Sequence, residues 1–522
     1  MWISAYGPQD LDLETDEESP VAVRRHDTES MQPTEKQGTP TGVTSDFPAQ
    51  RRLIGLWSAT GICVASMIGS GIFAVTGIVG AELVSASNLM LAWIIAGVLA
   101  LAGALTIGEL GAMRPKAGAQ YAVVFETLGP IWGYLNGMIT LFIGYIAAMA
   151  AIALVAGDYI EDLAPWTEVR TTATVILCGL GLIHAITVIG GKRFNDGLVI
   201  LKVLLVVGFI IAGFLATIEP ILPSAELIEA AKIFRPDSAL ATIPPDSTPA
   251  ATLEHLRNAP GPSAISGVIG LAVVSISFAY LGWSTAAEVG GEIRRPGLFL
   301  PLSIIGSVIV VGGMYLLMNL VYLRVVPAAG MLELDSNGAI QPMASIGATA
   351  ARSIFGEFGG RLVTGVIVLL FISTLSVSVM TSGRVVAALA WKGDFPASWG
   401  RLNPRGAPTL AILLMIAATI PLVWYSGLTS LLEFVGVLTT FAVCLTMISV
   451  MVLRVRFPDE PRPFKIPLYP LPPLISLGLG IWLIVTATIE DWVPVAASVA
   501  TLAAMLAARP FLRQADSGTP SP

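Results

Sequence analysis

Residues 53–80 read LIGLWSATGICVASMIGSGIFAVTGIVG, a run that is apolar and long enough to cross a membrane but is interrupted at its centre by Gly69-Ser70-Gly71. A transmembrane helix needs about 20 mostly apolar residues, and a glycine inside a helix costs about 1 kcal/mol relative to alanine. Two glycines and a serine in the middle of the span therefore predict either an unwound stretch or a surface for close helix packing.

The composition places the whole chain in a membrane. Of its 522 residues, 54% are hydrophobic and only 12% are charged, against about 25% charged in a soluble domain. The mean hydropathy is +0.77, and the net charge of −7 offers no basic surface for nucleic acid. Cys63, Cys178 and Cys444 all lie in apolar runs and form neither a disulfide framework nor a metal-binding pattern. We predict an all-α polytopic membrane protein without a metal or other cofactor.

About twelve apolar segments are long enough to span the membrane. We place them at about 53–80, 88–113, 130–157, 171–190, 197–218, 262–290, 300–325, 360–391, 408–426, 430–453, 468–488 and 492–508. Two long polar connections, 219–261 and 326–359, are predicted to be loops with short surface helices. Residues 1–50 are rich in Asp, Glu, Thr and Pro and predict a disordered tail without a signal peptide.

The basic residues set the predicted orientation. With the N-terminus inside, the even-numbered connections are cytoplasmic, and each of them carries Lys or Arg residues, as the positive-inside rule requires. The basic residues concerned are Arg114, Lys116, Lys192, Arg193, Arg294, Arg295, Lys392, Arg401, Arg405, Arg454, Arg456, Arg462 and Lys465. We expect a multi-pass protein of the cell membrane with both termini in the cytoplasm.

The sixth span is interrupted at a depth comparable to the first. Residues 277–296 read SFAYLGWSTAAEVGGEIRRP, with Gly282 in mid-span. A matched pair of broken helices indicates a transporter built from two inverted five-helix repeats. The half-helix ends offer N–H groups to an anion and carbonyls to a cation, which suits the carboxylate and ammonium of an amino acid. The predicted plan is a tail (1–50), a first repeat (51–218), an extracytoplasmic loop (219–261), a second repeat (262–453), two further helices (454–508) and a cytoplasmic tail (509–522).

Six motifs give the chain a specific resemblance. They are IGSGIF (68–73), GALTIGELGAMRPKAGAQY (103–121), FNDGLVILKVLLVVGF (194–209), FAYLGWSTAAEVGGEIRRPGLFLPLSI (278–304), TSGRVVAALAWKGDFP (381–396) and RPFKIPLYP (462–470). In this order they resemble the amino acid–polyamine–organocation superfamily, and most closely its bacterial amino acid permeases and L-type amino acid transporters. The resemblance implies a leucine-transporter-like fold of twelve helices in which helices 1 and 6 are broken.

The resemblance also implies where a substrate binds. In the family, N–H groups of the first break hold the substrate carboxylate, and carbonyls of both breaks hold its ammonium. Phe278 matches an aromatic residue that closes over the substrate, and we group Trp283 with it as a gating residue, although both also suit simple packing. Leu281 stands where relatives often have glycine, which disfavours large aromatic substrates. The implied binding residues are Ile68, Gly69, Ser70, Gly71, Phe278, Ala279, Tyr280 and Leu281.

Lys202 lies midway through the fifth span, where a lysine is costly to insert. It matches a family lysine whose ammonium stands where sodium-coupled relatives hold a cation. We expect it to contact first-helix carbonyls and eighth-helix hydroxyls, with Ser373, Ser376 and Ser378 as candidates. Two hypotheses stay open: Lys202 exchanges its proton and couples transport to protons, or it is a permanently charged structural residue.

Glu288 and Glu292 are four residues apart and share a helix face. Glu292 is interpreted as an ion-pair residue at the cytoplasmic end and Glu288 as a candidate proton site. Glu109 and Arg384 match the cytoplasmic ends of the second and eighth helices and are interpreted as gate or topology residues. His184 and Glu433 are interpreted as packing and solvated residues, respectively.

The predicted function is secondary active transport of amino acids by alternating access, coupled to protons or working by exchange. A polyamine or other amine transporter of the same fold is the first alternative, and a non-transporting receptor or a channel is an alternative of another class. An enzyme is not expected, because no nucleophile–base or metal constellation is present. The loop 158–170 contains no cysteine, so we expect no disulfide-linked heavy chain. The expected partners are an amino acid, the lipid bilayer and, in the coupled case, protons, but no nucleic acid.

Overall fold

The computed structural model describes residues 52, 54–115, 119–186, 192–234, 239–244, 247–263, 266–288, 290–334, 338–391 and 395–514. Within these ranges, eight helices and one bent helix pair are long and apolar enough to cross a membrane, and three shorter apolar helices accompany them. The prediction of an all-α protein with twelve spans is confirmed. The predicted tail at 1–50 lies outside the described residues.

The spans follow one another as the hydropathy predicts. They are α1 (Leu56–Met67) with α2 (Ser70–Leu83), α3 (Ala86–Met113), α5 (Pro130–Leu141) with η1 (Phe142–Ala147) and α6 (Ala148–Leu163), α7 (Val169–Ile186), α8 (Lys192–Leu215), α11 (Gly267–Ser277) with η2 (Phe278–Tyr280) and α12 (Thr285–Glu288), α13 (Pro296–Val325), α14 (Ile346–Trp391), α15 (Thr409–Tyr425), α16 (Leu428–Arg456), α17 (Leu471–Glu490) and α18 (Trp492–Gln514).

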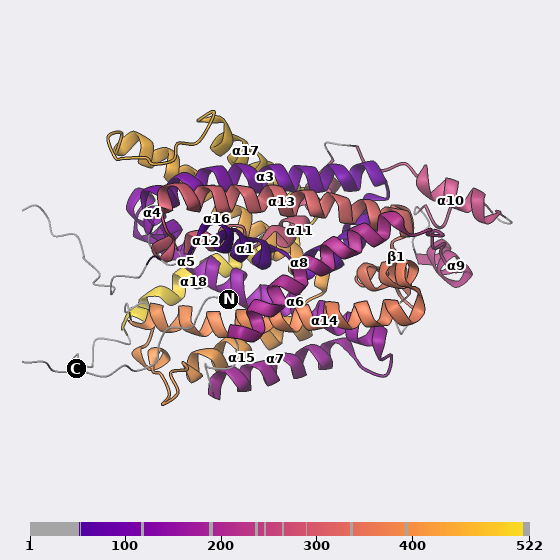
Figure 1. Cartoon of the computed structure of the whole chain (residues 1–522), viewed down its shortest axis with the longest axis horizontal. Helices are drawn as coiled ribbons and strands as arrows, with labels where there is room; N and C mark the ends of the chain where they lie inside the picture. The colour runs from indigo at the N-terminus through magenta and orange to yellow at the C-terminus, as the bar shows by residue number, and fades with distance from the viewer. Residues whose placement is uncertain are drawn as a thin grey trace, which may run out of the picture. The chain divides into compact units, whose positions relative to one another are not determined.

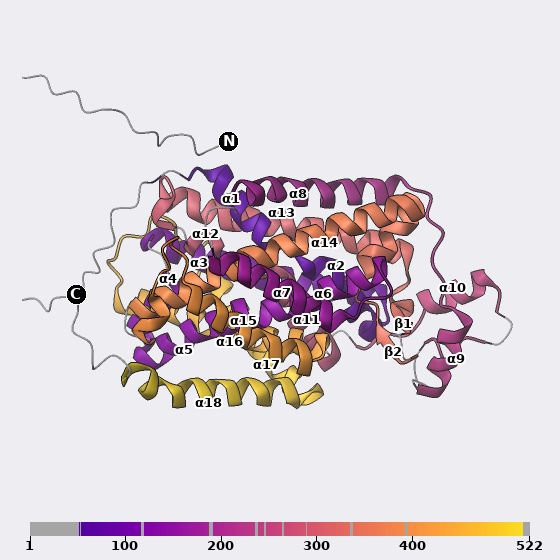
Figure 2. The ribbon, with the colours of Figure 1, turned by 90° about the horizontal axis from the view of Figure 1, so that it is seen from below.

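The connecting elements gather at the two ends of these helices. The connections contain α4 (Ala119–Leu128), α9 (Ala225–Phe234), α10 (Pro249–Arg257), η3 (Gly290–Glu292), η4 (Ala328–Gly330), η5 (Ala397–Gly400), and the antiparallel strands β1 (Leu332–Leu334) and β2 (Ile340–Pro342). The β1–β2 hairpin, α9 and α10 lie together at one end, which we call the hairpin end, and α4 lies at the opposite end, which we call the α4 end (Figures 1 and 2).

The first break separates α1 from α2 by a bend of 41°. Ile68 and Gly69 adopt extended conformations between the two half-helices. All of α2 except Glu82 is buried, because the hairpin connection covers it. A Cβ added at Gly77 would overlap the carbonyl oxygen of Met343, and one at Gly80 would overlap the Met331 sulfur. The half-helix that begins at the break is therefore enclosed at the hairpin end.

The second break lies in the sixth span and matches the prediction in place and depth. After α11, one 3-10 turn leads to Leu281, and Gly282 takes a φ of +97° that an L-residue rarely adopts. The α-helical conformation resumes after the break in the short helix α12. The two broken spans are also joined at the α4 end, where Arg294 N–H donates to the carbonyl of Ile54 over 2.8 Å.

Three features depart from the simple hydropathy pattern. The eighth span begins at Ile346 rather than near 360, because a short helix runs into it through Gly356, whose φ is +71°. The third span contains the π-helix η1, a local widening that often marks functional sites. The last helix continues to Gln514, beyond the expected end at 508.

Candidate substrate-binding site

The two breaks touch each other in the middle of the bundle. A Cβ added at Gly71 would overlap the Cα of Ala279, and one added at Gly282 would lie 2.6 Å from the Cβ of Ser66. Only glycine permits such an approach at these two positions, since 3.0 Å is already closer than side-chain carbons tolerate. The glycines predicted to unwind the helices therefore also allow the breaks to cross.

The start of α2 presents unpaired donors at this crossing. The first N–H groups of a helix have no intrahelical partner, and Gly69 in the N-cap position provides no side chain to bind them. The Ser70 hydroxyl is buried and finds no hydrogen-bond partner among the described residues. The N-terminus of α2, including Gly71, is thus arranged for an anion such as a carboxylate.

Tyr315 on α13 links the two breaks and was not anticipated from the sequence. Its hydroxyl donates its single proton to two carbonyl oxygens, that of Met67 at 2.7 Å and that of Ala279 at 2.9 Å. Its ring packs against Trp93 and Tyr280, each with ring centroids 5.3 Å away. The sequence offered no signal that separates Tyr315 from Tyr322, the other tyrosine of the same apolar span.

A cavity of about 360 Å³ opens at the crossing. Of the predicted site residues, Gly69, Ser70, Gly71, Phe278, Leu281, Trp283, Lys202 and Ser378 line it. Ile68 and Ala279 lie behind this lining and are buried, and Tyr280 lines a neighbouring cavity instead. The side chain of Glu288 lies outside the described residues.

Further polar groups in the cavity wall were missed by the sequence reasoning. They come from α1, the third span, the stretch after Gly282, α14 and α16, and comprise Ser66, Asn136, Thr140, Tyr145, Ser284, Thr285, Thr374, Thr381 and Thr439. The π-helix contributes Ile143, Gly144 and Tyr145. Hydroxyl residues are common in membrane helices, so the sequence alone did not distinguish these from packing residues.

Lys202 reaches the cavity from α8. Its ammonium donates to Thr374 Oγ1 on α14 over 2.7 Å, and the Thr374 hydroxyl donates in turn to the Leu370 carbonyl. The ammonium is thus next to an eighth-helix hydroxyl, but that hydroxyl belongs to Thr374 rather than to Ser373 or Ser376. Ser376 lies 2.8 Å from Nε2 of the buried His184.

The lining of the cavity reaches the α4 side of the crossing. Its wall includes Ala65 and Ser66 before the first break, Ser284 and Thr285 after the second, and Thr381 in the later part of α14. All five positions lie on the α4 side of the crossing, because α1 begins at that end and α12 and α14 run toward it (Figures 1 and 2). In the other direction α2 is buried, so the described conformation is closed at the hairpin end.

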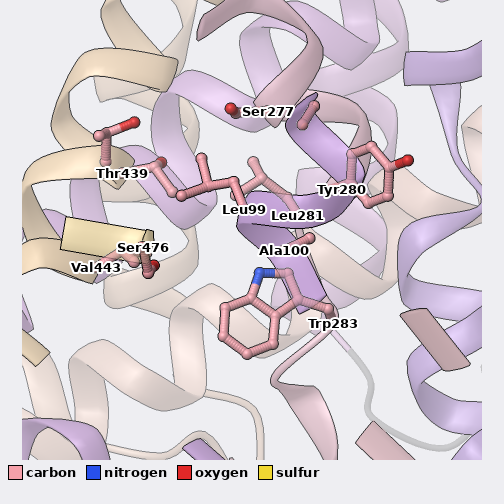
Figure 3. A pocket seen from close by; sticks show the side chains of 11 residues that line it. Leu99, Ala100, Ser277, Tyr280, Leu281, Trp283, Thr439, Val443 and Ser476 are labelled. Atoms are coloured by element: carbon pink, nitrogen blue, oxygen red, sulfur yellow. The ribbon is translucent and has the colours of Figure 1, made fainter. Parts of the chain in front are cut away.

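A second, smaller cavity of about 40 Å³ adjoins the first (Figure 3). Four residues line both cavities, namely Leu281, Trp283, Thr439 and Val443. We call this smaller space the side cavity.

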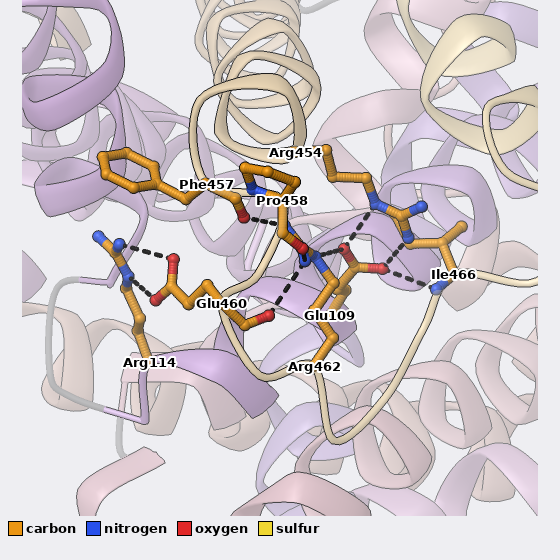
Figure 4. A network of polar contacts seen from close by, with 8 residues as sticks. All are labelled: Glu109, Arg114, Arg454, Phe457, Pro458, Glu460, Arg462 and Ile466. Atoms are coloured by element: carbon orange, nitrogen blue, oxygen red, sulfur yellow. Dashed lines mark hydrogen bonds and ion pairs between the residues drawn. The ribbon is translucent and has the colours of Figure 1, made fainter.

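The α4 end is held by a network around Glu109, which is fully buried at the end of α3 (Figure 4). Arg454 of α16 binds both carboxylate oxygens, with Nε at 2.8 Å from Oε1, and the backbone N–H of Ile466 donates to Oε2 over 2.7 Å. Nε of Arg462, a second cation, lies 3.5 Å from Oε1 of Glu109. Next to this cluster, Arg114 binds Glu460 through two hydrogen bonds of 3.0 Å. The predicted gate or topology residue Glu109 thus ties α3 to the α16–α17 connection.

The hairpin end carries charged groups of its own. Arg352 on α14 pairs with Asp162 at the end of α6. Burial, and next the negative charge of Asp162, raise the pKa of Glu333 on strand β1 to about 7. This carboxyl is therefore partly protonated at neutral pH, which lowers the repulsion between the hairpin and α6.

Twelve apolar spans, two broken helices and a polar cavity at their crossing define a secondary transporter of the membrane. The chain belongs to the amino acid permease family, whose model matches residues 54–509. It is an amino acid transporter and not an enzyme, and it lies within the superfamily that its motifs resemble.

Curated relatives cover nearly the same span. The chain is 28% identical to the serine/threonine exchanger SteT of Bacillus subtilis over 448 residues, which is 84% of this chain and 92% of the relative. It is 28% identical to the human large neutral amino acids transporter small subunit 2, over 89% of this chain and 81% of the relative. The mouse b(0,+)-type amino acid transporter 1 is 24% identical over 91% and 88%, respectively.

Proposed function

We propose that this protein carries neutral amino acids across the cell membrane by alternating access. The observation that carries the proposal is the crossing of the two breaks at the cavity, which brings the N-terminus of α2 and the carbonyls of η2 together. The substrate carboxylate binds the N–H groups of Ser70 and Gly71, and its ammonium binds the carbonyl of Ile68 and those of Phe278–Leu281. The Phe278 and Ala279 carbonyls already accept one bond each, but a carbonyl oxygen has a second lone pair.

The charge of the cavity favours an amino acid over a polyamine. The described residues that line it include no Asp or Glu, and Lys202 adds a positive charge. A polycation would meet this ammonium without a carboxylate to offset it, whereas a zwitterion presents its own carboxylate. A neutral side chain agrees with two of the relatives, a serine/threonine exchanger and a large neutral amino acids transporter subunit.

The proposed orientation places the α4 end in the cytoplasm together with both termini. Arg114, Arg294 and Arg462 lie in connections at this end and Arg454 in the last turn of α16, in agreement with the positive-inside rule. Two inverted repeats, residues 51–218 and 262–453, form the moving parts, and helices 454–508 follow them. We propose that the chain works without a disulfide-linked heavy chain, since residues 158–170 lack cysteine.

Uptake into proteoliposomes tests the proposal directly. A panel of radiolabelled amino acids and polyamines is offered with imposed proton or sodium gradients, with and without internal substrate. We expect saturable uptake of small neutral amino acids, accelerated by internal substrate in the case of exchange or by a proton gradient in the case of coupling. Uptake of polyamines alone, or a non-saturating flux, would contradict the proposal.

The role of Lys202 in coupling is tested with Lys202→Ala. If the ammonium of Lys202 exchanges a proton during transport, the variant loses the pH dependence of uptake that the wild-type protein shows. Thr374→Val is the matched variant, because it removes the hydroxyl that Lys202 binds but keeps the ammonium. Unchanged pH dependence in Lys202→Ala assigns this lysine a structural role.

A further inference from the structure

The side cavity lies between α3, the broken sixth span, α16 and α17. Its wall is formed by Ala96, Leu99, Ala100, Ser277, Tyr280, Leu281, Trp283, Thr439, Thr440, Val443 and Ser476 (Figure 3). It shares Tyr280 and Leu281 with the stretch whose carbonyls are proposed to bind the substrate ammonium. No Asp, Glu, Lys, Arg or His is among its described lining residues, so any ligand group that enters it is uncharged.

The side cavity contains an unsatisfied polar group. The Ser476 hydroxyl on α17 is fully buried and has no hydrogen-bond partner among the described residues. Buried polar groups are paired in most proteins, with the protein, a ligand or ordered water. The hydroxyls of Thr439 and Ser476 lie on one side of the space and the ring of Tyr280 on the other (Figure 3), so an entering group meets polar atoms and not only apolar ones.

The size of the side cavity limits what enters it. An ordered water needs roughly 10–15 Å³ of such space, so about 40 Å³ suits about three or four water-sized groups. A space of this size holds the terminal amide or hydroxyl of an amino acid side chain, but not an aromatic ring. The same space would also hold a few waters, and the experiment below separates these two occupants.

Leu281 is one of the four residues that lie between the side cavity and the substrate cavity. It lines both spaces and comes directly after Phe278–Tyr280, whose carbonyls are proposed to bind the substrate ammonium. Since ammonium, carboxylate and side chain share one carbon in an amino acid, the substrate side chain begins close to Leu281. A shorter or displaced side chain at this position would widen the space between the two cavities.

We propose that the side cavity is a polar subsite for the end of a substrate side chain, and that Leu281 closes it and thereby restricts transport to amino acids with short side chains. This proposal rests on the amino acid transport proposed above. It assigns to Leu281 a role in selectivity in addition to its backbone carbonyl, and to Ser476 a role as hydrogen-bonding partner for an amide or hydroxyl that passes Leu281.

The test measures inhibition constants in competition with labelled alanine uptake in proteoliposomes. Alanine, glutamine and leucine are compared, because glutamine and leucine are of similar length but only glutamine ends in an amide. Leu281→Ala is expected to lower the glutamine-to-alanine ratio of inhibition constants about fivefold to tenfold, the value of roughly one added hydrogen bond. The double variant Leu281→Ala with Ser476→Ala is expected to lose the advantage of glutamine over leucine.

Leu99→Ala is the matched control. It also shortens a leucine in the side-cavity wall, but Leu99 does not line the substrate cavity, so the wild-type ratio is expected to persist. Leu281→Val, which removes one methylene, is expected to change the ratio in the same direction by a smaller factor and serves if Leu281→Ala does not fold.

Three results would overturn the proposal. The first is an unchanged glutamine-to-alanine ratio in folded Leu281→Ala or Leu281→Val. The second is an equal gain for leucine and glutamine, which would show an apolar space. The third combines two measurements: Ser476→Ala changes the melting temperature, but the double variant still prefers glutamine over leucine. This result would show that the side cavity holds water only. Failure of the wild-type protein to transport any amino acid would instead refute the proposed function.

Discussion

At the residue scale, Gly71 is needed for two reasons at once. It lies in the first turn of α2, where a free N–H group faces the cavity, and it is the point at which that helix meets the Cα of Ala279. Any side chain at this position pushes the two breaks apart. Conformational freedom of glycine is not involved, because Gly71 is helical; the missing Cβ is what matters.

Gly71→Leu is therefore expected to abolish substrate binding while the protein still inserts and folds. Binding is measured by isothermal titration calorimetry on detergent-purified protein, with size-exclusion chromatography to check the fold. Gly61→Leu is the control, because Gly61 lies in α1 of the same broken span and a Cβ there meets no atom within 4 Å. Normal uptake by Gly71→Leu would refute the assignment of the carboxylate site.

Tyr315 is the residue whose hydroxyl holds both breaks in register. Tyr315→Phe removes the proton shared by the carbonyls of Met67 and Ala279 and leaves two buried acceptors unpaired. We expect a loss of about 1–2 kcal/mol in the stability of the crossing and a fall in transport rate of about fivefold or more. Initial rates of uptake, normalised to inserted protein, measure the effect.

Tyr322→Phe is the matched control for Tyr315→Phe. Tyr322 is on the same helix and equally buried, but its hydroxyl finds no partner among the described residues. Its removal is expected to leave the transport rate within about twofold of wild type, since no hydrogen bond is lost. Equal defects in the two variants would mean that ring packing, and not the hydrogen bonds, matters at Tyr315.

The site was predictable where backbone is involved and less so where side chains are. The breaks themselves leave a local trace in sequence, since Gly69, Gly71 and Gly282 interrupt apolar spans, whereas the resemblance to the permease superfamily implied which residues around them bind substrate. The partner of Lys202 was not found, because Ser373, Thr374 and Ser376 are adjacent on one helix and their directions depend on the rotation of α14 about its axis. Tertiary packing sets that rotation.

At the element scale, the spans were predictable from hydropathy and their irregularities were not. A π-helix such as η1 and the glycine kink at Gly356 change the hydrogen-bonding pattern without changing the apolar character of the segment. The β1–β2 hairpin is three residues per strand, too short for an alternating pattern to be distinguished from a polar loop. These elements depend on what they pack against, which for the hairpin is α2.

The α16–α17 connection is held to α3 through the buried carboxylate of Glu109 and, next to it, the ion pair of Arg114 with Glu460. Glu109→Gln keeps the shape of the side chain but leaves Arg454 and Arg462 without a countercharge. Breaking a buried ion pair costs about 3–5 kcal/mol, so we expect a clear fall in melting temperature, measured by thermal unfolding in detergent.

Glu126→Gln is the control for Glu109→Gln. Glu126 also pairs with an arginine at the α4 end, but its side chain is 39% exposed, and an exposed pair contributes about 1 kcal/mol or less. A melting temperature of Glu109→Gln close to that of Glu126→Gln would show that the network does not stabilise this end.

At the scale of the whole molecule, the closed hairpin end and the cavity on the α4 side describe one state of a transport cycle. Alternating access requires that the cavity open to one side at a time. Because the α4 end is proposed to be cytoplasmic, this state faces inward. Opening toward the hairpin end requires α2 to leave its contacts with Met331 and Met343, while the bond between Ile54 and Arg294 keeps the α4-side parts of the two broken spans together.

Cysteine labelling tests both the orientation and the state. In a chain whose Cys63, Cys178 and Cys444 are replaced by alanine, Thr381→Cys places a thiol in the cavity wall and Val75→Cys places one in buried α2. We expect a membrane-impermeant maleimide to label Thr381→Cys in inside-out vesicles and to leave Val75→Cys unlabelled. Labelling of Thr381→Cys only in right-side-out vesicles would reverse the orientation. Labelling of Val75→Cys without substrate would mean that the hairpin end is open at rest. A thiol at this position is as enclosed as Val75, so it reacts only when α2 moves away from the hairpin.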